Sequence, residues 1–172
     1  MERIAKFEKV STEQFTEDFK KLFPNFSEEE ISEIYGVISL PKRATAGSAG
    51  YDFFLPLDMK FLSNESVVIP TGIRAKIADG WVLNLYPRSG LGFKHGFRLE
   101  NTVGIIDSDY YNADNQGHIM AKVSVSSEVS LSAGKAFMQG VFLPFGITAD
   151  DSAEGERHGG FGSSDRQEKV TE

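Results

Sequence analysis

The feature that most constrains the fold is a two-residue hydrophobic period that begins near residue 37. Apolar and polar residues alternate over residues 73–77 and again over 81–85, and Asp79-Gly80 between them is a hairpin signal, because its turn requires positive φ angles. Other strand candidates are residues 51–55, 66–69, 97–106, 117–125, 128–131 and 136–143. Short strands at this spacing predict an all-β body, either closed or sandwiched.

The first 36 residues follow a different pattern. A short strand is predicted at residues 4–9, and two amphipathic helices are predicted within 11–36. Their capping pairs are Ser11 with Gln14 and Ser27 with Glu30. Gly36 stands where a helix C-terminal cap belongs. We expect a compact helical insert whose apolar face packs on the β body.

The C-terminal segment, residues 148–172, differs in composition from both preceding parts of the chain. Its only sizeable apolar side chains are Phe161 and Val170, among Gly, Ser, Asp and Glu. Such a segment cannot bury enough surface to offset its ordering entropy. The sequence therefore predicts one domain over residues 1–147 and a flexible arm over 148–172.

Composition narrows the class of partner. A net charge of −7 argues against non-specific binding to nucleic acid or to an anionic membrane. The chain has no cysteine, and its three histidines are scattered without metal-ligand spacing. No apolar run reaches the length of a membrane span, and the N-terminus lacks the apolar core of a signal peptide. We expect a cytoplasmic protein of one domain.

Four segments could carry chemistry. Three are rich in Gly and Ser, at residues 46–52, 87–92 and 157–164, and each could cradle a phosphate with backbone N–H groups, hydroxyls or an arginine. Each alone could equally be an ordinary turn. The fourth, 101–111, places Asp107 after an apolar strand, where a carboxylate could deprotonate water. The alternatives are a turn-initiating Asp107 and a structural or salt-bridged Asp109.

Taken in chain order, these segments resemble the five motifs of the trimeric dUTPase family. The matching segments are residues 49–52, 87–91, 104–110, 134–139 and 160–164, the last preceded by Arg157. The resemblance spans about residues 37–164. It implies a distorted jelly-roll, β-prism-like dUTPase fold and a homotrimer whose active sites are shared between subunits.

The resemblance also implies how a nucleoside would be recognised. The positions that match the uracil-reading hairpin are Asn101, Ile105, Ile106 and Met120. Backbone groups there would complement uracil and reject cytosine, because the wrong base leaves buried polar groups unpaired. Tyr110 matches the residue that packs under the deoxyribose and disfavours a 2′-hydroxyl. Its alternative role is core packing.

The triphosphate and the arm are assigned in the same way. The phosphate-binding positions are Arg88, Ser89, Gly90 and Gln139, with Asp52 as a supporting residue. Phe161 matches the residue that stacks on uracil from a closing arm. The arm residues expected to cover the phosphates are Arg157, Gly162, Ser163 and Ser164.

The implied reaction is hydrolysis of dUTP to dUMP and pyrophosphate. Asp107 would activate a water that attacks the α-phosphate, and the enzyme would limit dUTP while supplying dUMP for thymidylate synthesis. The implied cofactor is Mg²⁺, bound through phosphates and water with no direct protein ligand.

Two positions depart from the family's pattern. The fourth motif usually carries an arginine where this chain has Ala136, so only Gln139 is carried over from that motif. The third motif is followed by an extended turn at residues 111–116, which could reach a neighbour or simply lie on the surface. The resemblance implies no function for the helical insert.

Three other functions compete with this interpretation. A dCTP deaminase would share the fold and release ammonia. A non-catalytic nucleotide sensor could keep the pocket, but it would not need Asp107. A purely structural β trimer would leave the joint occurrence of five motifs unexplained.

Overall fold

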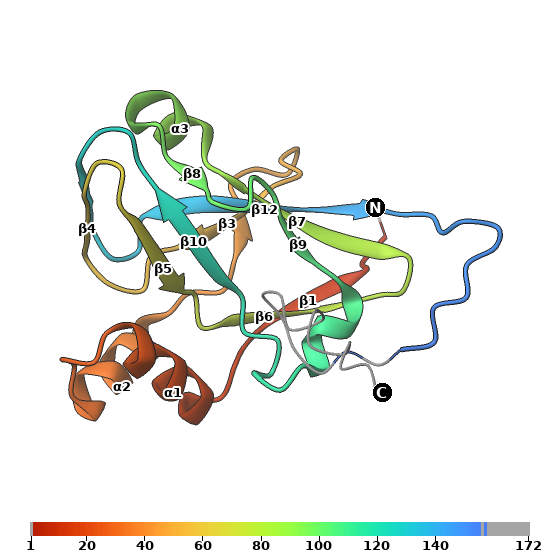
Figure 1. Cartoon of the computed structure of the whole chain (residues 1–172), viewed down its shortest axis with the longest axis horizontal. Helices are drawn as coiled ribbons and strands as arrows, with labels where there is room; N and C mark the ends of the chain where they lie inside the picture. The colour runs from red at the N-terminus through yellow and green to blue at the C-terminus, as the bar shows by residue number, and fades with distance from the viewer. Residues whose placement is uncertain (1, 156, 158–172) are drawn as a thin grey trace, which may run out of the picture.

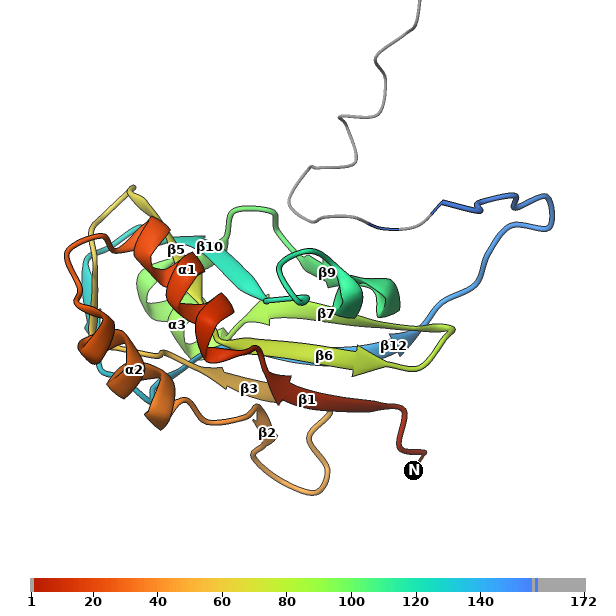
Figure 2. The same ribbon diagram turned by 90° about the horizontal axis from the view of Figure 1, so that it is seen from below.

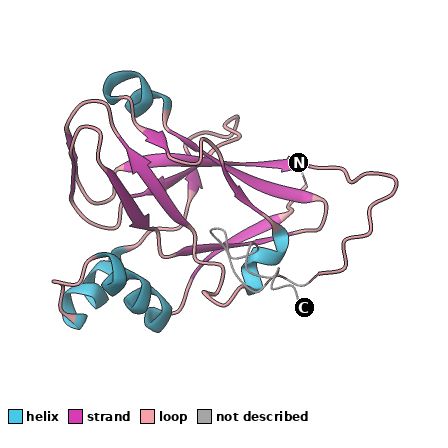
Figure 3. Cartoon of the chain, viewed as in Figure 1, coloured by secondary structure: helices cyan, strands magenta, loops and turns pink. Residues whose placement is uncertain are grey.

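The structure is a computed structural model that describes residues 2–155 and 157. Its strands are β1 (Ala5–Lys9), β2 (Lys42–Arg43), β3 (Tyr51–Phe54), β4 (Met59–Phe61), β5 (Ser66–Pro70), β6 (Ile73–Ile77), β7 (Trp81–Pro87), β8 (Arg98–Leu99), β9 (Gly104–Ile106), β10 (Met120–Ser124), β11 (Val129–Leu131) and β12 (Ala136–Pro144). The helices are α1 (Thr12–Leu22), α2 (Glu28–Val37), α3 (Ser89–His95) and the 3₁₀ helix η1 (Ser108–Asn112). Figure 3 shows the strands forming the body and the helices lying around it.

The strands form antiparallel sheets that enclose one main core. The largest sheet has the order β2-β3-β12-β7-β9, and a second has the order β5-β10-β8. β1 pairs with β6, and β4 pairs with β11. Alternation determines which side chains enter the core: Ile73, Ala75 and Ile77 of β6 are buried, whereas Lys76 is exposed. The predicted all-β body is confirmed.

Two local predictions were incomplete. The strand expected over 97–106 is divided into β8 and β9 by a turn in which Thr102 has a φ of 63°. Threonine rarely adopts positive φ, so the sequence contains no sign of this turn. Helix α3 was not predicted, because Gly90 and Gly92 disfavour a helix in that segment.

The two helices of the insert form as predicted, with differences at their ends. Ser27 and Glu30 make the reciprocal capping box of α2. Ser11 caps α1 by accepting a hydrogen bond from the Gln14 backbone N–H, but the Gln14 side chain bonds Asp18 instead of completing the box. Gly36 lies inside α2, which continues to Val37 and has Ile38 as its C-cap, so its predicted capping role is wrong.

The insert has a small core that joins the main one. Val10, Phe15, Phe19 and Ile31 are buried together. Phe23, Ile38 and Leu57 are partly buried and pack against both this cluster and the core of the β body. Figure 2 shows α1 and α2 together on one flank of the strands. The apolar face of the insert therefore packs on the β body, as expected.

Beyond β12 the chain leaves the sheets. Residues 145–155 contain no helix or strand, and the Phe145 backbone N–H still donates to the Gly80 carbonyl at 3.0 Å. Among the described residues, no helix combines the length and the apolar character needed to cross a lipid bilayer.

Candidate active site

A cavity of about 290 Å³ lies between β9 and the beginning of β10. The lining residues are Leu85, Asn101, Val103, Gly104, Ile105, Ile106, Tyr110, Met120 and Arg157. We call it the β9 pocket. It brings together all four positions predicted to read uracil, the tyrosine predicted under the sugar, and one predicted arm residue.

The walls of the β9 pocket expose strand edges. Within the described residues, β9 pairs only with β7, so one edge of β9 has no ladder partner. Met120 begins β10 on the opposite wall of the pocket. Its backbone pairs with Pro70 of β5 on the side away from the pocket. Backbone N–H and C=O groups on such edges need partners, and a flat molecule with donors and acceptors along its rim can supply them.

Tyr110 forms a buried wall of the pocket and is 4% exposed. Its hydroxyl donates to the His118 carbonyl at 2.9 Å and accepts from Asn115 Nδ2 at 2.9 Å. Burial raises the pKa of the Tyr110 hydroxyl, which keeps it a neutral donor. The side chain is therefore held at both its ring and its hydroxyl.

Asp107 follows β9 directly and precedes η1. Its side chain makes no capping hydrogen bond to η1, although its position is the N-cap. The carboxylate is 43% exposed and accepts from Arg157 Nη2 at 2.5 Å, while Arg157 Nε lies 2.8 Å from Asp109 Oδ1. This geometry argues against the turn-initiating alternative for Asp107, because the carboxylate is not used by the turn. The expected salt bridge of Asp109 is present.

The predicted phosphate-binding residues form a second cluster. Strand register places Gln139 of β12 opposite Asp52 of β3, and Arg88 Nη1 lies 3.6 Å from Asp52 Oδ2. A Cβ on Gly50 would lie 2.6 Å from Gln139 Oε1, so glycine leaves room for that side chain. Ser89 and Gly90 follow Arg88 as the first residues of α3.

The two clusters lie at opposite ends of β7. Ile106 pairs with Leu83, near the start of β7, whereas Arg88 follows its last residue. Five residues of extended strand span roughly 17 Å. Figure 1 shows α3 and η1 at opposite ends of the β body. One chain thus does not bring Arg88 and Asp107 together.

The remaining predicted residues belong to the C-terminal arm and to the fourth motif. Phe161, Gly162, Ser163 and Ser164 lie outside the described residues. Arg157 lies against Asp107 and Asp109. Ala136, where the family's fourth motif usually carries an arginine, is buried in β12 and pairs with Phe54. Residues 2–155 and 157 contain no group of three or more His, Asp or Glu side chains placed to hold a metal ion.

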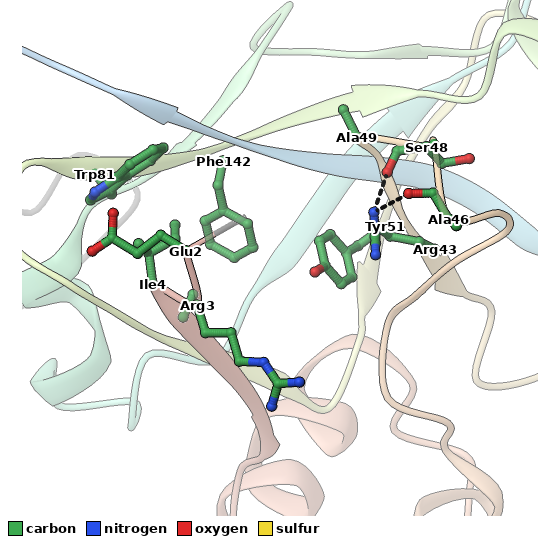
Figure 4. A pocket seen from close by; sticks show the side chains of 12 residues that line it. Glu2, Arg3, Ile4, Arg43, Ala46, Ser48, Ala49, Tyr51, Trp81 and Phe142 are labelled. Carbon is green, nitrogen blue, oxygen red and sulfur yellow. Dashed lines mark hydrogen bonds between the residues drawn. The ribbon is translucent and has the colours of Figure 1, made fainter.

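A larger cavity, about 880 Å³, lies elsewhere. It is open and is bordered by the N-terminal segment, Trp81 and Phe142 on one side and by the loop at 46–49 on the other (Figure 4). Arg43 donates to the Ala46 carbonyl there at 2.8 Å. Apart from residues of the first motif it contains no predicted site residue, so its size does not make it the active site.

Sequence reasoning missed the side chains behind the β9 pocket. His118 is fully buried, and its Nδ1 lies 2.8 Å from Asp18 Oδ2 in α1. These residues are 100 positions apart, so no local pattern links them. Asn115, which bonds Tyr110, lies in the extended turn that the resemblance left unexplained.

The fold and pocket define the class: an all-β, jelly-roll-like protein with a pocket of about 290 Å³ beside a partly exposed carboxylate. A family model described as dUTPase matches residues 37–165. The chain therefore belongs to the dUTPase family, which confirms the resemblance, the predicted fold and the enzyme class of dUTP diphosphatase.

Individual relatives agree with this assignment. The deoxyuridine 5'-triphosphate nucleotidohydrolase of Lactococcus lactis subsp. lactis (strain IL1403) is 42% identical over 132 residues, covering 74% of this chain and 88% of the relative. That of Escherichia coli O9:H4 (strain HS) is 39% identical over 138 residues, with the same coverages.

Solved structures agree with the fold. The dUTPase from Streptococcus mutans is 35% identical with a TM-score of 0.61, covering 83% of this chain and 97% of that one. A mutant dUTPase from phage phi11 of S. aureus, whose structure details the coordination of a structural Mg(II) ion, has a TM-score of 0.61 at 17% identity, covering 89% of this chain and 98% of that one. At that identity it shares the fold.

Proposed function

We propose that this chain hydrolyses dUTP to dUMP and pyrophosphate and that Asp107 activates the attacking water. The observation that carries this proposal is the placement of Asp107. Its carboxylate is exposed, is not used as a cap, and directly follows the strand that lines the β9 pocket. A base in such a position can reach a water beside a bound nucleotide.

The β9 pocket would take the deoxyuridine. The free edge of β9 offers alternating donors and acceptors, which suits the uracil rim and opposes cytosine, whose exocyclic amine reverses the pattern. The Tyr110 ring would lie against the deoxyribose. Because its hydroxyl is already bonded to His118 and Asn115, it would leave a 2′-hydroxyl without room or a partner.

The reaction would then proceed by in-line attack. Asp107 accepts a proton as water oxygen bonds to the α-phosphorus, and the bond from that phosphorus to the bridging oxygen breaks. Pyrophosphate leaves with the electron pair. Arg157, which is bonded to Asp107 in this structure, would have to release the carboxylate, and as part of the arm it would then bind the phosphates held in a neighbour's pocket.

The proposal includes Mg²⁺ carried by the substrate. The carboxylates beside the pocket, Asp107 and Asp109, are paired with Arg157. These residues fit an ion that keeps several waters and takes its other ligands from phosphates, so no protein ligand is assigned. When bound, the ion would neutralise charge on the triphosphate and orient the α-phosphate.

The active site would be composite, in a homotrimer. Asp107 and Arg88 must act on the same nucleotide, yet the register of β7 and β9 separates them by roughly 17 Å within one chain. A neighbouring subunit can bring its own Arg88 cluster to the β9 pocket, as closed symmetric oligomers repeat each surface. The arm at 148–172, with Phe161 to Ser164, would close over a neighbour's pocket.

In the cell this activity would limit dUTP and supply dUMP for thymidylate synthesis. The proposal places the enzyme in the cytoplasm, with dUTP as its ligand and with neither nucleic acid nor membrane as a partner. The acidic net charge of −7 supports the absence of a polyanionic partner.

Two measurements test the proposal. The purified chain is incubated with dUTP, dCTP, dTTP or UTP and Mg²⁺, and pyrophosphate and ammonia are assayed. We expect pyrophosphate from dUTP alone, whereas ammonia from dCTP would indicate a deaminase. Asp107→Asn should lower kcat by about 100-fold or more, because the general base is lost, while dUTP binding persists. An active Asp107→Asn enzyme would disprove the assignment of the base.

A further inference from the structure

The turn that carries Asp107 and Tyr110 is anchored by the N-terminal helical insert. Residues 107–117 contain η1 but no strand, so no sheet ladder fixes them. Instead, the Tyr110 hydroxyl donates to the backbone carbonyl of His118. The position of that carbonyl therefore determines where the Tyr110 ring lies in the β9 pocket.

The His118 ring is fixed from two sides. Its Nε2 accepts the backbone N–H of Gly72 at 2.8 Å, which assigns the ring proton to Nδ1. Nδ1–H then donates to Asp18 Oδ2 at 2.8 Å. Both contacts are directional, and the ring is fully buried, so residue 118 has one accessible geometry.

Asp18 connects this ring to α1. Its side chain is 7% exposed and also accepts from Gln14 Nε2 at 2.9 Å. Burial alone would raise the pKa of Asp18, but hydrogen bonds from His118 and Gln14 outweigh it and lower the pKa, so the carboxylate is charged. The hydrogen bonds that Asp18 accepts from His118 and Gln14 are directional, so they fix where the His118 ring lies relative to α1.

A second contact holds the same turn. Gln116 Oε1 accepts the Ser11 backbone N–H at 2.9 Å, and Gln116 Nε2 donates to Ser11 Oγ at 3.2 Å. Gln116 thus completes the cap of α1 that Gln14 leaves open. The N-cap and the second turn of α1 each contact the segment that follows Tyr110.

We infer that Asp18 and His118 are positioning residues that fix Tyr110 in the β9 pocket and thereby set the discrimination between deoxyribose and ribose. The inference rests on the proposed function, because it assigns the sugar to Tyr110. Neither residue lines the β9 pocket, so both act through the His118 backbone and the Tyr110 hydroxyl.

The test compares kcat and KM for dUTP and UTP. Asp18→Ala removes the acceptor for His118, and we expect the dUTP/UTP ratio of kcat/KM to fall about tenfold to a hundredfold, as misplacement of a binding group does. Asp18→Asn keeps an acceptor oxygen and should restore most of the ratio. Phe19→Leu, in the same helix, is the control: it should lower the Tm and leave the ratio unchanged.

A second variant covers failure of Asp18→Ala to fold. Asp18→Leu/His118→Phe replaces the pair by apolar groups and removes the directional contacts. It also removes the acceptor of the Gly72 backbone N–H, so a lower Tm is expected. We expect it to fold and to lose selectivity as Asp18→Ala does. An unchanged dUTP/UTP ratio in a folded variant of either kind would overturn the inference.

A double-mutant cycle tests the route through Tyr110. In a Tyr110→Phe background the hydroxyl link is absent, so Asp18→Ala should change selectivity by less than about twofold. Full, independent effects of both substitutions would overturn the inference. If the wild-type chain hydrolyses no dUTP, the proposed function fails separately. The same variants are then titrated with dUMP and UMP, and an unchanged affinity ratio would overturn the positioning role itself.

Discussion

At the scale of single residues, the turn beside the β9 pocket is also tied to the first strand. Glu8 of β1 accepts from the Tyr111 hydroxyl at 2.7 Å and pairs with Arg74 Nη2 at 3.4 Å. The Arg74 guanidinium lies over the Tyr111 ring, 3.8 Å from its centroid. One carboxylate therefore links β1, β6 and η1.

The Glu8 network predicts a loss of stability in acid. Hydrogen bonds from Lys6 and Tyr111 lower the pKa of Glu8 from 4.5 to about 2. Because the pKa is lower in the folded state, the contribution of Glu8 is present above pH 4.5 and is lost as the pH falls toward 2. Urea midpoints at pH 7, 4.5, 3 and 2 should converge for wild type and Glu8→Gln at the acid end. A constant difference across this range would contradict the prediction.

At the scale of elements, the extended turn after the third motif is a docking element for α1. The sequence left open whether residues 111–116 reach a neighbour or lie on the surface. In the structure Gln116 caps α1 and Asn115 bonds Tyr110, so the turn connects the insert to the pocket of its own chain. The length of the turn is thereby explained.

The cap contributed by Gln116 should make a measurable contribution to the free energy of unfolding. Gln116→Ala removes both hydrogen bonds to Ser11 and should lower the free energy of unfolding by about 0.5–2 kcal/mol, the range for lost helix caps. Asp114→Ala, at an exposed position of the same turn, should change it by less than about 0.5 kcal/mol. Urea denaturation measures both, and equal effects would argue against a capping role for Gln116.

At the scale of the whole molecule, the two ends of β7 carry different parts of one site. The Arg88 cluster and the β9 pocket are each complete in local geometry but lie roughly 17 Å apart along the strand. If the proposed homotrimer forms the site, catalysis depends on assembly, and we expect dissociation of the subunits to abolish activity without unfolding them.

Mixed assemblies test this dependence. Arg88→Ala and Asp107→Asn chains should each be inactive alone. When the two chains are unfolded and refolded together in equal amounts, they should recover about a quarter of wild-type activity. Half of the subunits carry an unaltered Asp107 and the other half an unaltered Arg88, and a composite site needs one of each. Native mass spectrometry confirms that subunits have mixed. Mixed trimers without activity would show that one chain supplies both residues.

Much of the fold could be predicted because its signals are local. Alternation identified β6 and β7, and Ser27 with Glu30 marked the start of α2. The division of 97–106 was missed because Thr102 adopts an uncommon φ, and α3 was missed because Gly90 and Gly92 disfavour helices.

Some features of the candidate site could be predicted from the sequence, and others could not. The resemblance of short motifs to the family assigned Ile105, Ile106 and Tyr110, which lie close together in sequence and line the β9 pocket. The pairing of Asp18 with His118 depends on tertiary packing across 100 residues, and no periodicity reports it. The separation of Arg88 from Asp107 depends on strand register, which the sequence does not specify without the pairing partner.

The contact between α1 and residues 116–118 also sets an order of events during synthesis. Helix α1 has 11 residues, too few to be stable alone in water. Gln116, which completes its cap, and His118, the buried partner of Asp18, leave the ribosome about 100 residues later, several seconds at ordinary elongation rates. The N-terminal insert is therefore made early but folds late, and its apolar face must be kept from aggregating in the interval.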